Sequence, residues 1–137
     1  MTVGLPASGK TTWARKFCEN NENYVRINRD DLRNMSGVYW YPPREKYITD
    51  LEKFAVKAAL KRGFGVILDA TNLNPKVGFW VKEIAREHGC EIRSEYFPTP
   101  LEECIRRDKG RENSVGEDVI RSMYERYLIS QNSINEG

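Results

Sequence analysis

Short apolar runs in the sequence predict four strands. Gly65–Asp69 is an uninterrupted apolar run that ends in a carboxylate, as central parallel strands often do. Tyr24–Asn28 lies between an asparagine cluster and an acidic pair and predicts a second strand. The side chains of Glu91–Phe97 alternate in the way that predicts a strand with one face more exposed to water. Met1–Val3 predicts an unusually short first strand, because buried strands usually have about five residues.

Amphipathic stretches between these runs predict helices. A helix that begins near Gly9 ends at Asn20-Asn21, and a second begins at Asn28. A longer helix over 44–61 and another that opens at Asn74-Pro75 follow. The residues expected to face inward are, for the first helix, Trp13, Ala14 and Phe17; for the third, Tyr47, Leu51, Phe54, Ala55, Ala58 and Ala59; and for the fourth, Phe79, Trp80, Ile84 and Ala85.

The last third of the chain predicts two more helices. Thr99–Glu102 and Ser114–Glu117 both read as capping boxes. Between them, the cationic stretch 106–111 contains a glycine and predicts a mobile segment. The polar tail 130–137 is expected to fray. The final helix is expected to bury one face, made by Val119, Ile120, Met123, Tyr124, Tyr127 and Leu128.

Alternating strands and helices predict an α/β fold of the P-loop NTPase type. We expect a parallel sheet of about four strands, helices on both faces, and a lid in the C-terminal part. The length of 137 residues corresponds to one domain, 1–137. The net charge of +2 neither requires nor excludes a polyanionic partner. The three cysteines, Cys18, Cys90 and Cys104, are widely spaced, which favours reduced thiols over disulfides. The sequence shows no membrane-spanning run and no leader pattern, and we expect a cytoplasmic protein.

Gly4–Thr12 fits the phosphate-binding P-loop pattern G-x-x-x-x-G-K-[ST]. Its backbone N–H groups would cradle phosphate oxygens, Lys10 would reach the β- and γ-phosphates, and Thr11 would place its hydroxyl on Mg²⁺. We therefore predict ATP and Mg²⁺ as cofactors. The residues expected to bind the nucleotide are Gly4, Pro6, Ala7, Ser8, Gly9, Lys10, Thr11 and Thr12.

The guanine-reading N-K-x-D segment of GTPases is absent, and 137 residues leave no room for the extra elements of a ring or motor ATPase. A small kinase is favoured, and it needs a proton acceptor beside the acceptor hydroxyl. Asp30 and Asp31 are the candidates, and Asp30 shares a helix face with Arg33, which would hold a phosphate of the acceptor. A capping role is the alternative and suits Asp31 better.

Four further groups have a functional and a structural interpretation. Arg107 and Arg111 would neutralise the γ-phosphoryl from a lid, or lie on a solvated helix end. Asp69 would act on Mg²⁺, and Thr71 and Asn72 would face the acceptor, or all three would cap the strand. Tyr39–Tyr41 would stack on a base or pack on its own domain. Arg106 and Lys109 are expected to face solvent.

These motifs resemble the kinase domain of phage-type polynucleotide 5′-kinase/3′-phosphatase. The resemblance runs from Val3 to about Tyr127 and rests on Gly4–Arg15, Ile27–Arg33, Asp69–Pro75 and Val119–Tyr124. It implies transfer of the γ-phosphoryl of ATP to 5′-hydroxyl ends of DNA or RNA in end repair. It also implies that Lys10 and Thr11 serve ATP and Mg²⁺, that Asp30 is the general base, that Arg33 holds the acceptor phosphate, and that Arg107 and Arg111 are lid arginines.

Other interpretations stay open at this point. The alternative acceptors are a nucleoside, a sugar and an aminoacylated tRNA, and the alternative class is a nucleotide-gated binding module that hydrolyses little. No D-x-D-x-T phosphatase motif and no K-x-D-G ligase motif is present. The sequence does not distinguish DNA from RNA, and it does not indicate an oligomeric state.

Overall fold

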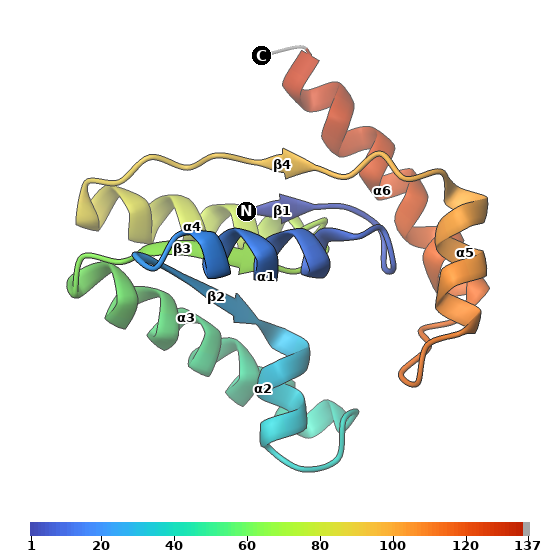
Figure 1. Cartoon of the computed structure of the whole chain (residues 1–137), viewed down its shortest axis with the longest axis horizontal. Coiled ribbons are helices and arrows are strands. Elements are labelled where there is room, and N and C mark those ends of the chain that lie inside the picture. Colours follow the sequence, from blue (N-terminus) through green and yellow to red (C-terminus); the bar gives the residue numbers. More distant parts are fainter. Residues whose placement is uncertain (136–137) are drawn as a thin grey trace.

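The computed structural model describes residues 1–135 (Figure 1). Helices and strands alternate along the chain as the sequence predicts, and a 3₁₀ turn, η1, precedes the longest of the central helices. The elements are β1 Thr2–Val3, α1 Lys10–Asn20, β2 Tyr24–Asn28, α2 Arg29–Met35, η1 Pro42–Arg44, α3 Glu45–Lys61, β3 Gly65–Asp69, α4 Pro75–His88, β4 Glu95–Tyr96, α5 Leu101–Lys109 and α6 Glu117–Asn135.

The four strands are parallel and form two ladders. β2 pairs with β3 over its full length, and β1 pairs with β4 through two residues. The side chain of Thr2 joins the ladders: its hydroxyl lies 2.9 Å from the carbonyl oxygen of Ala70 and accepts from the Ala70 N–H at 3.1 Å. Gly4 N–H donates to the Thr71 carbonyl close by. The predicted parallel arrangement of about four strands is confirmed, in the spatial order β2-β3-β1-β4.

The predicted strand 91–97 was too long. Only Glu95–Tyr96 is a strand, because β1 offers just Thr2 and Val3 as ladder partners. Residues 91–94 are irregular and exposed, although the carbonyl of Arg93 accepts a hydrogen bond from the amino terminus.

Helices cover both faces of the strands, as expected (Figure 1). Along β2, Tyr24 faces α1, where its ring makes an edge contact with Phe17. Ile27, on the other face, packs in a cluster with residues of α3 and α4. Trp13 of α1 contacts Phe97, next to β4, so that α1 touches both ladders through aromatic rings.

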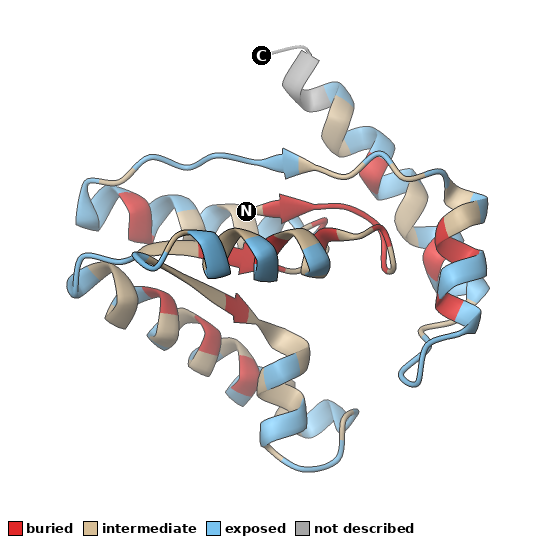
Figure 2. Cartoon of the chain, in the orientation of Figure 1, coloured by how far each residue is buried: buried red, intermediate tan, exposed pale blue. Residues whose placement is uncertain are grey.

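Each ladder has its own hydrophobic core, and Figure 2 marks the buried residues of the chain in red. The core beside β2 and β3 is made by Ile27, Val56, Leu68 and Ile84. The core beside β1 and β4 includes α5 and α6 and is made by Val3, Leu5, Leu73, Cys104, Ile105, Ile120 and Tyr127. β1 and β3 meet where the two ladders join, and each therefore packs against a different hydrophobic core.

Three aromatic residues predicted to face inward are exposed. Tyr47 and Phe54 on α3 are 53% and 72% exposed, and Phe79 on α4 is 73% exposed. The buried residues of α3 are instead Ile48, Glu52 and Val56, spaced by four. Because this buried row includes the carboxylate of Glu52, the inner face of α3 looks less apolar in the sequence than the neighbouring exposed face. This explains why the wrong face was predicted to be buried. Val119 and Leu128 of α6 are also exposed, whereas Ile120 and Tyr127 are buried as predicted.

Neither predicted capping box forms. The hydroxyl of Thr99 donates to the carbonyl of Ser8, 2.7 Å away, and α5 begins after Pro100 without a side-chain cap. The hydroxyl of Ser114 donates to Asp108. α5 continues to Lys109 where a mobile segment was predicted, and α6 continues through Asn135 where fraying was predicted. The rest of the predicted frayed tail, 136–137, lies outside the described residues.

Within residues 1–135, no helix has both the length and the hydropathy that crossing a bilayer requires. The three cysteines are free, and Cys104 is buried.

Candidate active site

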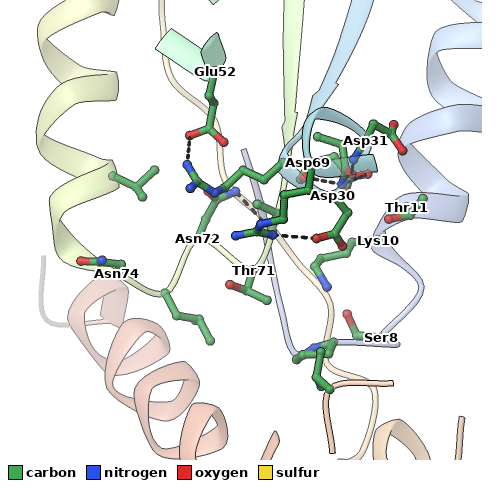
Figure 3. Close-up of a pocket in the computed structure, with 18 of the residues that line it drawn as sticks. Ser8, Lys10, Thr11, Asp30, Asp31, Glu52, Asp69, Thr71, Asn72 and Asn74 are labelled. Carbon is green, nitrogen blue, oxygen red and sulfur yellow. Dashed lines mark hydrogen bonds and ion pairs between the residues drawn. The ribbon is translucent and has the colours of Figure 1, made fainter. Parts of the chain in front are cut away.

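A cavity of about 1130 Å³ lies at the C-terminal ends of β1, β2 and β3. Its walls come from the P-loop, α2, the first halves of α3 and α4, and the end of α5. In parallel α/β sheets ligands bind at this edge. The volume exceeds the roughly 300–1,000 Å³ of an ordinary single-ligand pocket, so there is room for two substrates. Figure 3 shows Lys10, Asp30, Asp69 and Glu52 around this space.

The P-loop has the backbone geometry that its sequence predicts. Gly9 is left-handed at φ 99° and directly precedes α1, and Ala7 is also at positive φ. A Cβ at Gly4 would come within 2.8 Å of the Ser8 hydroxyl and 3.0 Å of Phe97, so only glycine fits without a shift. Pro6, Ala7, Ser8, Gly9, Lys10, Thr11 and Thr12 all line the cavity, whereas Gly4 supports the loop from behind.

Lys10 is the buried cation of the loop. Its ammonium donates to the Leu5 carbonyl at 2.8 Å. Burial lowers the pKa of Lys10 to about 8, although the negative charge of Asp69 opposes this shift. A buried ammonium with a lowered pKa lacks anionic partners, and phosphate oxygens would supply them.

Asp30 lies on the first turn of α2 and lines the cavity with Lys10. One carboxylate oxygen, Oδ1, accepts from Arg33 Nη1 at 2.8 Å and from the hydroxyl of Tyr39 at 2.9 Å. Burial, together with this bond, raises the pKa of Tyr39 and keeps the phenol protonated as a donor. The predicted Asp30–Arg33 pair is present, and Asp31, which also lines the cavity, pairs with Arg26.

Arg33 is enclosed by carboxylates and aromatic rings. Glu45, at the start of α3, accepts from its Nε at 3.0 Å and from its Nη2 at 2.6 Å, and this raises the pKa of Arg33. The guanidinium carbon lies 5.9 Å from the ring centre of Tyr39 and 5.7 Å from that of Trp40. Two members of the Tyr39–Tyr41 cluster therefore pack on Arg33. Glu45 was not predicted as a site residue, because an acidic residue at a helix start is common.

Asp69 ends β3 with no exposed side-chain surface. Its Oδ2 accepts from Arg26 Nε at 2.7 Å, while its Oδ1 has no hydrogen-bond partner among the described residues. The hydroxyl of Ser8 is likewise buried without a partner there. Arg26 was not predicted as a site residue, and its signal in the sequence is a charged residue inside a mostly apolar strand.

A second buried acid, Glu52, reaches the cavity from α3. Burial raises its pKa against the opposing charge of Arg29, whose Nη1 lies 3.6 Å away. Arg29 also contacts Glu45, so a chain of alternating charges links α2 to α3. Sequence reasoning missed Glu52 because it lies within an amphipathic helix.

Arg107 and Arg111 reach the cavity from the other side, at the end of α5 and just after it. Arg107 Nη1 lies 3.4 Å from the carbonyl of Ala7, and the charge of Arg111 contributes to the lowered pKa of Lys10. Arg106, by contrast, is exposed as predicted. Asp108 fixes the loop after α5 by accepting from the backbone N–H groups of Val115 and Gly116.

Thr71 and Asn72 also line the cavity. The amide nitrogen of Asn72 is directed at backbone carbonyls, the nearest being that of Thr2 at 2.6 Å. Asn72 also adopts φ 53°, which asparagine tolerates better than most residues. These contacts favour the structural alternative for Asn72, whereas Thr71 stays a candidate acceptor contact.

Comparison with known proteins gives consistent results. The chain matches the AAA_33 family, described as an AAA domain, over residues 1–128. It is 30% identical over 129 residues to L-seryl-tRNA(Sec) kinase of Methanococcus maripaludis, covering 91% of this chain and 50% of that protein. The structure of the Pnkp1/Rnl/Hen1 RNA repair complex contains a similar chain, with TM-score 0.84, 31% identity, and coverage of 96% of this chain and 44% of that one.

A second structure, of the Pnkp1/Rnl/Hen1 complex, is similar with TM-score 0.70 and 37% identity, over 77% of this chain and 37% of that chain. The chain spans about half the length of the curated relative and less of these two. The family match covers nearly all of it, and the P-loop, the parallel strands and the polar cavity agree with that match. The chain therefore belongs to the AAA_33 family and has a P-loop kinase-like α/β fold.

Proposed function

We propose that this chain is an ATP-dependent polynucleotide 5′-hydroxyl kinase that acts in nucleic-acid end repair. The observation that carries the proposal is the position of Asp30, whose carboxylate lines the same cavity as Lys10 and is held by Arg33 and Tyr39. A general base must lie within reach of the hydroxyl that it deprotonates. A carboxylate facing the phosphate loop across a shared space meets that requirement.

In the proposed reaction the acceptor oxygen attacks the γ-phosphorus as the bond to the β-phosphate oxygen breaks. Asp30 takes the hydroxyl proton, and ADP leaves. Lys10 and the P-loop N–H groups stabilise the negative charge on the β- and γ-phosphates. Arg107 and Arg111 add positive charge from α5 and the loop after it, on the opposite wall of the cavity.

The residues present fit a bound Mg²⁺. Hard cations take oxygen ligands, and the unpartnered Asp69 Oδ1 and the hydroxyl of Thr11 are oxygens that line the cavity. When bound, Mg²⁺ would neutralise phosphate charge. Arg26 and Asn28 hold the other oxygen of Asp69 and so orient this carboxylate.

The similarity to a chain of an RNA repair complex supports a polynucleotide acceptor. The similarity to an L-seryl-tRNA(Sec) kinase favours a second candidate, an aminoacylated tRNA whose serine hydroxyl accepts the phosphoryl group. Both acceptors present a hydroxyl at the end of a nucleic acid, and both would need Asp30 as the base.

A competition assay distinguishes the two acceptors. The protein is given labelled ATP with a 5′-hydroxyl oligonucleotide of RNA or DNA, a seryl-tRNA, or a nucleoside. Transfer to the oligonucleotide is expected, and no transfer to any 5′-hydroxyl end contradicts the proposal. Asp30→Asn should lower kcat by roughly 10²- to 10⁴-fold while ATP still binds. The adjacent Asp31→Asn is the matched control, and its kcat should stay close to that of the unchanged protein. If Asp30→Asn keeps normal turnover, Asp30 is not the base.

A further inference from the structure

The cavity extends beyond the residues that the proposed reaction uses. Past Asp30 it continues between the first halves of α3 and α4, where its lining includes Lys53, Lys76, Phe79 and Trp80. Among residues 1–135, no hydrogen bond, ion pair or ring contact joins these side chains to the P-loop. This extension lies on the wall formed by α3 and α4, whereas Lys10 lies on the wall formed by the P-loop and α1, so we place the extension on the acceptor side.

Phe79 is the unusual residue of this extension. It is 73% exposed although it lies on an amphipathic helix, and Trp80 beside it packs against the core of β2 and β3. An exposed phenyl ring on the wall of a cavity stabilises no core. A ring of this kind can stack on a base, because every base has a π face whatever its sequence.

Positive charge accompanies the aromatic ring. Lys76 precedes Phe79 by three residues on α4 and therefore lies on the same face of the helix. The ammonium of Lys53 on α3 lies 5.8 Å from the ring centre of Trp80. Glu83 is the one acidic residue of α4 on this wall, and it lies further along the helix. Lys76 near the exposed Phe79 ring and Lys53 over Trp80 give this wall two positive charges and an exposed ring, a combination that binds single-stranded nucleic acid.

We propose that this extension is a subsite for the acceptor strand, in which the base of a nucleotide that follows the reacting one stacks on Phe79 while Lys76 and Lys53 contact backbone phosphates. The inference rests on the proposed function for the identity of the reacting end. It adds that the enzyme reads a strand rather than an isolated nucleoside, and that binding there depends little on base sequence.

Strand binding is measured without turnover, by fluorescence anisotropy of a labelled single-stranded 5′-hydroxyl oligonucleotide. Phe79→Ala should weaken binding by on the order of tenfold, since stacking contributes about 1–3 kcal/mol per base. Phe79→Trp should restore it. Lys76→Gln should lower the slope of log affinity against log salt by about 0.7, the effect of one phosphate contact on a single strand. Lys82→Gln, on α4 but outside the cavity lining, is the control and should leave the slope unchanged.

Kinetics separate the two proposals. With a nucleoside 3′-phosphate as acceptor, Phe79→Ala should leave kcat and KM unchanged, whereas with the oligonucleotide it should raise KM alone. Equal effects on both acceptors, or no effect on strand binding, overturn the subsite. Strand binding that depends on Phe79 without any phosphorylation would overturn the kinase proposal and leave the subsite standing.

Discussion

Arg26 holds one oxygen of Asp69 and leaves the other free. Its Nε lies 2.7 Å from Asp69 Oδ2, and its Nη1 lies 2.6 Å from Asp31 Oδ2. Asp69 is completely buried and Arg26 is 13% exposed, whereas Asp31 is 52% exposed. One guanidinium thus makes an interior and a surface ion pair at once, and the interior pair sets which oxygen of Asp69 is available to the cavity.

Arg26→Met should lower the free energy of unfolding by about 3 kcal/mol, because it leaves the buried Asp69 carboxylate without its partner. The measurement is urea unfolding at neutral pH. Asp31→Asn breaks only the exposed pair and should cost under about 1 kcal/mol. Adding Asp69→Asn to Arg26→Met should recover part of the loss, since no buried charge then remains. If Arg26→Met and Asp31→Asn lower the free energy of unfolding by the same amount, the buried ion pair contributes no more stability than the exposed one.

The lowered pKa of Lys10 predicts a pH dependence of nucleotide binding. Only the charged ammonium attracts phosphate, and in the nucleotide-free protein this charge is lost as pH rises through about 8. ATP affinity should therefore fall above pH 8, by up to about tenfold per pH unit, and binding there should take up a proton. Calorimetry in buffers of different ionisation enthalpy measures both effects.

Lys10→Arg provides the control for this titration, because a guanidinium keeps its charge throughout the range. Binding by this variant should be weaker but nearly independent of pH between 7 and 9.5 (roughly the range over which the ammonium titrates). An unchanged ATP affinity of the original protein up to pH 9.5 would contradict the lowered pKa.

Asp108 ties the end of α5 to the start of α6. Burial alone would raise its pKa, but hydrogen bonds from Ser114, Val115 and Gly116 outweigh burial, and the pKa is lowered. Asp108→Asn should cost about 2 kcal/mol of unfolding free energy at pH 7. Because the folded-state pKa is depressed, the stabilisation is present above the ordinary pKa and is lost as pH falls through the folded value. The difference between the two proteins should shrink in acid, and Glu112→Gln, exposed in the same loop, should change little.

Arg107 and Arg106 are adjacent arginines that both pair with Glu103, yet only Arg107 lines the cavity. Arg107→Ala should lower kcat by on the order of 10²- to 10³-fold with little change in acceptor binding, because it removes charge stabilisation at the departing γ-phosphoryl. Arg106→Ala should leave kcat unchanged. Steady-state kinetics checks both. If Arg107→Ala weakens binding of every acceptor and spares kcat, then Arg107 positions phosphate instead.

Sequence patterns predicted the parts of this molecule whose structure is locally determined. The P-loop spacing, the strands at 24–28 and 65–69, and the Asn28 and Asn74 caps are as expected. The pairing of Asp30 with Arg33 was also predictable, since both lie on one helical turn. These features depend on neighbours within a few residues, and the sequence shows such neighbours directly.

The missed residues act through partners far away in the chain. Arg26 meets Asp69 from another strand, and Glu45 meets Arg33 from another helix. Thr99 looked like a helix cap, but its hydroxyl donates to Ser8, which is distant in sequence. The exposed Phe79 was assigned to the core because periodicity marks an apolar face and does not say whether a cavity lies beside it. Tertiary placement decides each of these cases.

The hydroxyl of Thr2 connects two halves of the molecule, each of which has its own hydrophobic core. The phosphate-binding loop leaves β1, which belongs to one half, while Asp30 stands at the end of β2 in the other. The spacing between the two reacting groups therefore depends on a joint that neither group touches. A rotation of a few degrees at this joint would change the attack distance, and we expect it to disturb the two hydrophobic interiors less than the reaction, because each interior lies within its own half.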